Sequence, residues 1–134
     1  MLRRDSVIGD YVGEAACDAF AMSHSVSVGD TTYFSGLAPL KEVDGELRLV
    51  GEDSIERQME YMLDVLERSL KNLDMDRGNV ACWTVYVTQS ADFPKVLPLL
   101  RAWVGSQRPA CTLVEVKGFL FPGQLLELTV IAAR

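Results

Sequence analysis

The stretch from residue 53 to residue 73 constrains the fold more than any other part of the chain, because its apolar residues recur at the spacing of one helical face. Asp53 and Glu56 have the form of a capping box at its start. The apolar face contains Ile55, Met59, Met62, Leu63, Leu66, Leu70 and Leu73. Such a helix is stable when its apolar face is covered, and we expect it to pack flat on a sheet.

Residues 80–88 give the clearest strand pattern, and large side chains occur on both of its faces. One face carries Val80, Cys82, Thr84, Tyr86 and Thr88, and the other carries Ala81, Trp83, Val85 and Val87. A second helix is expected to begin at Asp92, which can cap it, and to end at Gly105. Two further strands are expected over residues 110–116 and 125–132.

The first third of the chain has weaker patterns. Residues 25–35 alternate around a Gly-Asp pair and predict a hairpin, and residues 36–51 predict a loop or a loose hairpin. Residues 1–22 show no clear period and are interpreted as a short strand and a loop. The expected element order, ββ-α-β-α-ββ, is an α+β fold: one domain over residues 1–134, with a single mixed β-sheet and two helices on one face.

Composition and burial restrict the partners of this fold. The formal net charge of −6 argues against nucleic acid, and no segment is apolar for long enough to cross a bilayer. Three cysteines without a CxxC pair indicate reduced thiols in the cytoplasm. His24 is the single histidine, so neither a metal site nor a cofactor is expected. Because the strands are apolar on both faces and the helices cover one, self-association is expected.

Three stretches carry motifs that occur in a fixed order. Residues 29–39 read GDTTYFSGLAP, residues 85–93 read VYVTQSADF, and residues 108–116 read RPACTLVEV, followed by LEL at 126–128. In this order and at these distances, the stretches resemble the motifs of the reactive-intermediate deaminase family (Rid, or YjgF). The likeness covers roughly residues 25–134.

The resemblance implies a homotrimer with its helices outside and small-molecule pockets at the subunit seams. Typical members hydrolyse reactive enamines and imines, such as 2-aminoacrylate, to a keto acid and ammonia, and the resemblance implies no cofactor. This reaction needs a group that holds the substrate carboxylate, a task that suits the planar fork of arginine. It also needs a group that positions water and moves a proton.

The residues that match the family's pocket are Ser35, Gly36, Thr112 and Glu127. By the same resemblance, four positions differ from the family's pocket. Cys111 stands where the family has the arginine, Met22 where it has a tyrosine, His24 where it has a glutamine, and Leu97 where it has an asparagine. No other residue of the local run is expected to offer a fixed cation, because Arg108 comes three residues earlier and Lys117 six later. The expected pocket keeps the residues that shape it and one carboxylate. It lacks the arginine that would bind the carboxylate of the substrate, and its wall is more apolar.

Glu127 and Cys111 each allow more than one interpretation. Glu127 lies on an otherwise apolar strand, where an unpaired carboxylate is costly, so we expect either a function or a subunit-interface ion pair with Arg101 or Arg108. Cys111 is either a small buried hydrophobe or a nucleophile, with His24 as its base and Glu127 as the orienting group. Taken alone, His24 is expected on the surface or in a loop.

The leading expectation is an enzyme that acts on a small imine, enamine or related reactive intermediate other than 2-aminoacrylate. The absent arginine favours a neutral or bulkier, less anionic substrate. Glu127 and Cys111 are the expected catalytic residues, and the expected substrate-binding residues are Ser35, Gly36, Met22, His24, Leu97 and Thr112. Two alternatives stay open: a non-catalytic trimer that binds a metabolite or a partner protein, and a thiol-dependent enzyme built on Cys111 and His24.

Overall fold

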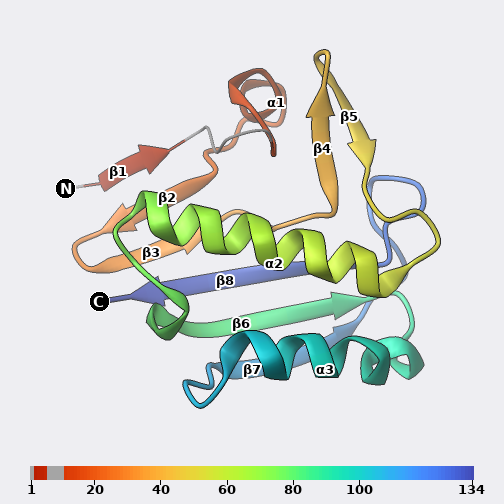
Figure 1. Ribbon diagram of the computed structural model, residues 1–134. Coiled ribbons are helices and arrows are strands. Elements are labelled where there is room, and N and C mark those ends of the chain that lie inside the picture. Colours follow the sequence, from red (N-terminus) through yellow and green to blue (C-terminus); the bar gives the residue numbers. More distant parts are fainter. Residues whose placement is uncertain (1, 6–10) are drawn as a thin grey trace.

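The computed structural model describes residues 2–5 and 11–134. Its main sheet has six strands in the order β1-β2-β3-β8-β6-β7, and the helices α2 and α3 lie across one face (Figure 1). These strands are β1 (Leu2–Asp5), β2 (Ser25–Val28), β3 (Thr31–Phe34), β6 (Val80–Val87), β7 (Ala110–Glu115) and β8 (Leu126–Ala133). Neighbouring strands are antiparallel except β6 and β7, which are parallel. The predicted α+β fold with one mixed sheet and two helices on one face is confirmed.

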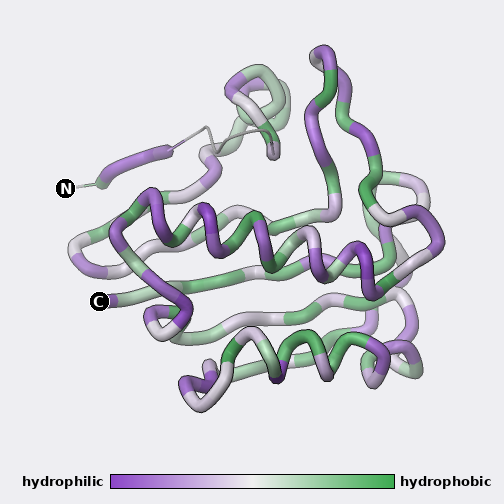
Figure 2. The backbone as a smooth tube through the Cα atoms, viewed as in Figure 1, coloured by the Kyte–Doolittle hydropathy of each residue, from purple (hydrophilic) through white to green (hydrophobic). Residues whose placement is uncertain are grey.

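Helix α2 (Ile55–Asn72) agrees with the predicted helix except at its cap. The side chain of Ser54 accepts a hydrogen bond from the backbone N–H of Arg57, whereas Asp53 lies outside the helix with a φ of 59°. The predicted Asp53 cap is therefore wrong, because the chain makes a left-handed turn at that residue. Hydrophilic and hydrophobic residues alternate along the helix (Figure 2), and Met59, Met62 and Leu66 are fully buried against the sheet.

Helix α3 (Phe93–Val104) packs beside α2 and over β6 and β7. Asp92 occupies its N-cap position but makes no capping bond, because its carboxylate pairs with Lys95 at 3.1 Å. The predicted aspartate cap is therefore wrong, although the start of the helix is right. Gly105, with a φ of 59°, ends the helix as predicted. Two short 3-10 helices precede β6 and α3, at Arg77–Asn79 and Ser90–Asp92.

Strand β6 has the predicted two-faced pattern from Cys82 onward. Trp83, Val85 and Val87 are buried beneath the helices, and Cys82, Thr84 and Tyr86 are half-buried on the opposite face. A register irregularity between Val80 and Cys82 interrupts the alternation. Val80 is consequently 4% exposed, and the prediction that it shares a face with Cys82 is wrong.

The N-terminal part contains a helix that the sequence did not predict. Helix α1 (Glu14–Ala19) has six residues, too few to give a recognisable period. The predicted short strand corresponds to β1, and the predicted loose hairpin is a second sheet of β4 (Leu40–Val43) and β5 (Glu46–Leu49). Residues 6–10 of the predicted loop lie outside the described residues.

The face of the main sheet opposite α2 and α3 is not covered by the protomer. Tyr33 on β3 is 47% exposed there, and it pairs in register with Ile131 on β8. Ile131 in turn lies opposite Cys82 of β6. This partly apolar face supports the expected self-association, and the trimer itself stays a prediction. Within the described part of the chain, no helix is long and apolar enough to span a membrane.

Candidate functional site

The predicted site residues lie in different places on one protomer. Met22, Gly36 and Glu127 line one pocket, which we call the Glu127 pocket. Leu97 and Cys111 line a second, the Cys111 pocket. His24 lines neither of them and lies beside a third, smaller cavity next to β1. Ser35 and Thr112 line none of the three.

The Glu127 pocket has a volume of about 330 Å³ and a mainly apolar wall. The segment that follows helix α1, the β4-β5 hairpin and the loop before β8 supply most of its apolar side chains: Phe20, Met22, Leu40, Leu47, Leu120 and Phe121. Leu120 is 86% exposed at the rim. The polar residues of the pocket are Tyr11, Gln124 and Glu127. The pocket is therefore suited to a ligand with an apolar body and one polar end.

Glu127 reaches the pocket across the backbone of Gly36. A Cβ atom built at Gly36 would lie 2.6 Å from Oε2 of Glu127, closer than any real contact of that kind. The two segments are held together by reciprocal bonds between Leu37 and Leu128, with N···O distances of 2.7 and 3.0 Å. The glycine is thus required by the carboxylate that lies against it.

The hydroxyl of Ser35 has a structural partner beside this glycine. Ser35 donates a 2.5 Å hydrogen bond to the carbonyl oxygen of Ser23, and its backbone N–H donates to the carbonyl of His24. These bonds fix the chain at the point where it leaves β3 and enters the pocket wall. Ser35 therefore helps to shape this turn, and its predicted role in binding substrate stays a prediction.

The electrostatic setting of Glu127 is that of a partly desolvated acid. Burial raises the pKa of Glu127, and a hydrogen bond from Gln124 opposes the rise. Nε2 of Gln124 donates to Oε1 of Glu127 at 3.2 Å and to the carbonyl of Leu126 at 3.0 Å. Within the described protomer no cation pairs with Glu127, and a carboxyl group whose pKa is raised by burial is suited to proton transfer.

A fully buried glutamine fixes the loop that carries Gln124. The side-chain amide of Gln58 on α2 donates to the carbonyls of Gly51 and Gly123, at 3.2 and 3.1 Å. Its Oε1 accepts from the backbone N–H of Leu125 at 2.9 Å. The bonds from Gln58 therefore fix the backbone on both sides of Gln124, and the side chain of Gln124 that orients Glu127 is carried by a fixed loop.

Tyr11 is a pocket residue that the sequence interpretation missed. Its side chain is 3% exposed, and its hydroxyl accepts a 3.0 Å hydrogen bond from the backbone N–H of Ala38. Burial raises the pKa of Tyr11 far above its usual value, and the charge of Glu127 adds to the rise. Tyr11 lies in a segment without a period, so no local signal could have indicated this contact.

His24 is buried and neutral rather than exposed. It is 5% exposed, and its Nε2 lies 3.0 Å from Oγ of Ser69. Because Ser69 donates its own hydrogen to the carbonyl of Val65, Nε2 of His24 is the donor in this bond. Burial lowers the pKa of His24 to about 4. His24 lies in the loop directly before β2, as one of the two expected positions, but it is not on the surface, because its ring packs edge-on against Tyr11 and Phe34.

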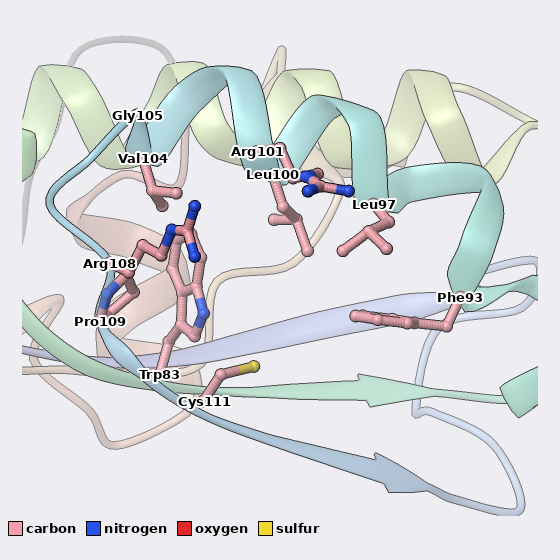
Figure 3. Close-up of a pocket in the computed structure, with 10 residues that line it drawn as sticks. All are labelled: Trp83, Phe93, Leu97, Leu100, Arg101, Val104, Gly105, Arg108, Pro109 and Cys111. Carbon is pink, nitrogen blue, oxygen red and sulfur yellow. The ribbon is translucent and has the colours of Figure 1, made fainter.

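The Cys111 pocket lies between α3 and the start of β7 (Figure 3) and has a volume of about 370 Å³. Cys111 pairs in register with Trp83, so its side chain points toward the helix side of the sheet. The thiol is exposed in the protomer, and the interpretation as a buried hydrophobe is wrong for the single chain. Thr112 points to the opposite face, beside Thr84, and therefore away from this pocket.

Two arginines line the Cys111 pocket, contrary to the expectation that it has no cation. Arg101 comes from the last turn of α3 and Arg108 from the segment before β7, and both side chains lie at the cavity in Figure 3. Neither has an ion-pair partner among the described residues. Separation along the chain did not indicate this position, because the turn after α3 brings Arg108 to the same cavity.

The predicted dyad of Cys111 and His24 is not assembled within one protomer, since the two residues line different cavities. Nε2 of His24 is also engaged by Ser69, which leaves it poorly placed as a base. Among the described residues, no group of three or more His, Cys, Asp or Glu side chains is arranged to hold a metal ion.

Comparisons with known proteins identify the family. Residues 14–134 match the family described as endoribonuclease L-PSP. A YjgF/YER057c/UK114 family protein from Mycobacterium tuberculosis shares the fold over all of both chains, with 22% identity and a TM-score of 0.81. A Rid family protein from Yersinia pestis covers 84% of this chain and 86% of its own, with 25% identity and a TM-score of 0.74. No curated protein matches. The chain belongs to the endoribonuclease L-PSP family, which includes the YjgF and Rid proteins.

Proposed function

We propose that this protein hydrolyses a small imine or enamine other than 2-aminoacrylate, yielding a carbonyl compound and ammonia, with Glu127 as the proton-transfer group. The observation that supports this most is the carboxylate of Glu127. It is partly desolvated, it is oriented by Gln124, and it lies against Gly36 in an apolar pocket. A carboxylate is costly in such a place, and a role in proton transfer explains its presence.

The proposed reaction uses water as the only co-reactant. Glu127 takes a proton from a water molecule while the oxygen of that water bonds to the carbon of the C=N group. The proton then passes to the nitrogen and gives a carbinolamine. Loss of the hydroxyl proton through Glu127 and departure of ammonia leave the carbonyl product, and Glu127 returns to its starting state. The raised pKa of Glu127 lies closer to neutral pH than that of an ordinary carboxyl group, and proton transfer in both directions becomes more efficient as the pKa approaches the working pH.

The wall of the Glu127 pocket indicates the substituent that the substrate carries. Phe20, Met22 and Leu120 offer apolar contacts in the same pocket as the carboxylate. A substrate with a branched aliphatic or aromatic group gains the free energy of burying that surface, about 25 cal/mol per Å². The single methylene group of 2-aminoacrylate is too small to use these contacts, which supports a substrate larger than 2-aminoacrylate.

The Cys111 pocket would complete the site in the expected trimer. By the family resemblance, pockets lie at subunit seams, so Arg101 and Arg108 of one subunit would face Glu127 of the next. An acid group on the substrate would then be held by these guanidinium groups instead of by an arginine at position 111. This replaces the expectation of a neutral substrate with that of an apolar imino acid.

Two other functions are less well supported. The family description mentions an endoribonuclease, but a net charge of −6 argues against binding to the phosphate backbone of RNA. A non-catalytic trimer that binds a metabolite or a partner protein is the alternative, because Cys111 takes the position of the family's arginine. Turnover assays separate this alternative from the enzyme.

Imines made in the assay by an amino-acid oxidase test the substrate range. We expect the protein to accelerate ammonia release from the imines of leucine and phenylalanine more than from that of alanine. Cys111→Arg, which restores the guanidinium of the family, should improve the alanine-derived imine relative to the other two. Absence of acceleration with all three imines, together with calorimetric binding of the corresponding oxo acids, would support the non-catalytic alternative.

A further inference from the structure

Tyr11 places an unused hydrogen-bond donor in the Glu127 pocket. Its hydroxyl oxygen accepts from Ala38 at 3.0 Å, which uses one lone pair and leaves the phenolic hydrogen free. No residue of the described chain accepts that hydrogen within bonding range. A donor in a site with 3% exposure loses its bond to water, so a ligand is the partner that would satisfy it.

The phenol and the carboxylate converge on one small region. Ala38, which fixes the Tyr11 oxygen, follows two residues after Gly36, against which Glu127 lies. Both side chains line the same cavity. The charge of Glu127 also acts on the phenol, since it contributes to the raised pKa of Tyr11. One cavity therefore offers a hydrogen-bond donor from Tyr11 and an acceptor from Glu127.

The ring of Tyr11 is held in place by its neighbours. The rings of His24 and Tyr61 pack against it, with centroid distances of 5.7 and 6.3 Å. His24 is itself fixed by its bond to Ser69 on α2. His24 thus lies behind the pocket, as a positioning residue for Tyr11 rather than as a residue that contacts the ligand.

We propose that Tyr11 donates its phenolic hydrogen bond to the nitrogen of the substrate C=N group and so polarises the bond for attack by the water that Glu127 activates. This inference rests on the proposed function. The phenol keeps its proton throughout, and every proton that moves passes through Glu127, so the balance of the reaction is unchanged. Its raised pKa keeps Tyr11 protonated at all physiological pH values, which suits a donor and excludes a base.

Tyr11→Phe and Tyr61→Phe form a matched pair that tests the proposal. Each removes one hydroxyl from neighbouring rings, but only Tyr11 lines the pocket. With the leucine-derived imine, we expect Tyr11→Phe to lower kcat/KM by about 10- to 100-fold, mainly through kcat, and Tyr61→Phe to stay within about twofold of wild type. Equal effects of the two changes would overturn the proposal.

Tyr11→Phe also removes the acceptor of the Ala38 N–H, so a second variant keeps the hydroxyl in place. Replacement of Tyr11 by 3,5-difluorotyrosine retains the ring and its bonds but gives a more acidic phenol. The alkaline limb of the kcat/KM profile should move to lower pH, because the donor is then lost at lower pH. A profile identical to that of wild type contradicts the proposed donor.

Binding of 4-methyl-2-oxopentanoate, which has a carbonyl in place of the C=N group, separates this inference from the proposed function. If wild type binds it without hydrolysing any imine, and Tyr11→Phe weakens binding about tenfold, the donor role stands and the hydrolase proposal fails. If Tyr11→Phe binds it as tightly as wild type, the donor role is overturned even where hydrolysis occurs. Failure of the wild type both to bind and to hydrolyse overturns both.

Discussion

The carboxylate of Glu127 occupies the space that a side chain at residue 36 would need, with Oε2 only 2.6 Å from the position of a Cβ atom. The pocket is therefore built around one close approach between a backbone and an acid. Reciprocal bonds between Leu37 and Leu128 leave little freedom for the two segments to separate. The consequences of this arrangement can be measured one residue at a time.

Gly36→Ala should displace the Glu127 carboxylate. We expect a loss of about 1–3 kcal/mol in the free energy of unfolding, measured with urea, because the added methyl group overlaps the carboxyl group of Glu127, which must shift and give up its bond to Gln124. The same change in a Glu127→Ala background should cost much less, since the overlap is then absent. An equal loss in both backgrounds would show that the two residues are not coupled.

Glu127→Gln should stabilise the protein while reducing its activity. Burial raises the pKa of Glu127, so its carboxyl favours folding when protonated, and this contribution is lost as the pH rises through the folded pKa. Glutamine stays neutral and keeps an oxygen for Gln124. The variant should therefore have a higher Tm than wild type at pH 8, and the difference should disappear below about pH 4. A lower Tm at pH 8 would contradict the desolvated state of Glu127.

His24 should make stability fall as the pH falls. Burial lowers its pKa from 6.5 to about 4, so the unfolded chain binds a proton between these values and the folded chain does not. The contribution is present above about pH 6.5 and is lost toward pH 4, up to about 3 kcal/mol. His24→Gln keeps an N–H donor for Ser69 without this titration. The free energy of unfolding, measured with urea and plotted against pH, should differ in slope between the two proteins from pH 4 to 6.5. Parallel plots would refute the buried neutral histidine.

Arg101 and Arg108 are expected to bind the carboxylate of the substrate and no other part of it. The imine of leucine, and the imine that an amine oxidase makes from 3-methylbutylamine, have the same branched side chain and differ by one carboxylate. Arg101→Ala and Arg108→Ala are expected to raise the KM for the leucine-derived imine about tenfold or more. The KM for the imine of 3-methylbutylamine should change by no more than about twofold. Equal effects on both imines would mean that the two arginines hold no carboxylate.

The uncovered sheet face should join the subunits. Tyr33 is 47% exposed at its centre, and we expect Tyr33→Asp to place a charge in a buried interface. Light scattering should give wild type a mass three times that of the 14.8 kDa chain and give the variant a lower mass. A monomeric wild type at micromolar concentration would refute the trimer.

The sequence predicted the parts of the fold that have a regular period. The helix over residues 53–73 and the strand over residues 80–88 were correct apart from a cap and a register irregularity, because long amphipathic patterns are set by burial. Helix α1 was missed because it has six residues. The buried setting of Glu127 was also predictable, since its strand is otherwise apolar.

The composition of the pocket was less predictable, because it depends on contacts between distant segments. The bond between Tyr11 and Ala38 joins residues 27 positions apart, and Gln58 reaches the loop before β8 across 67 positions. Arg108 reaches the Cys111 cavity through the turn after α3. The orientation of Thr112, by contrast, follows from strand alternation, which places it on the opposite face from its neighbour Cys111.

The most direct test of the central claim is the rate of ammonia release from the leucine-derived imine, with wild type and Glu127→Gln compared at equal concentrations of folded protein. Wild type should accelerate the release, and Glu127→Gln should lower kcat/KM by about 10²- to 10⁴-fold without loss of fold. Equal rates for the two proteins would contradict the assignment of proton transfer to Glu127.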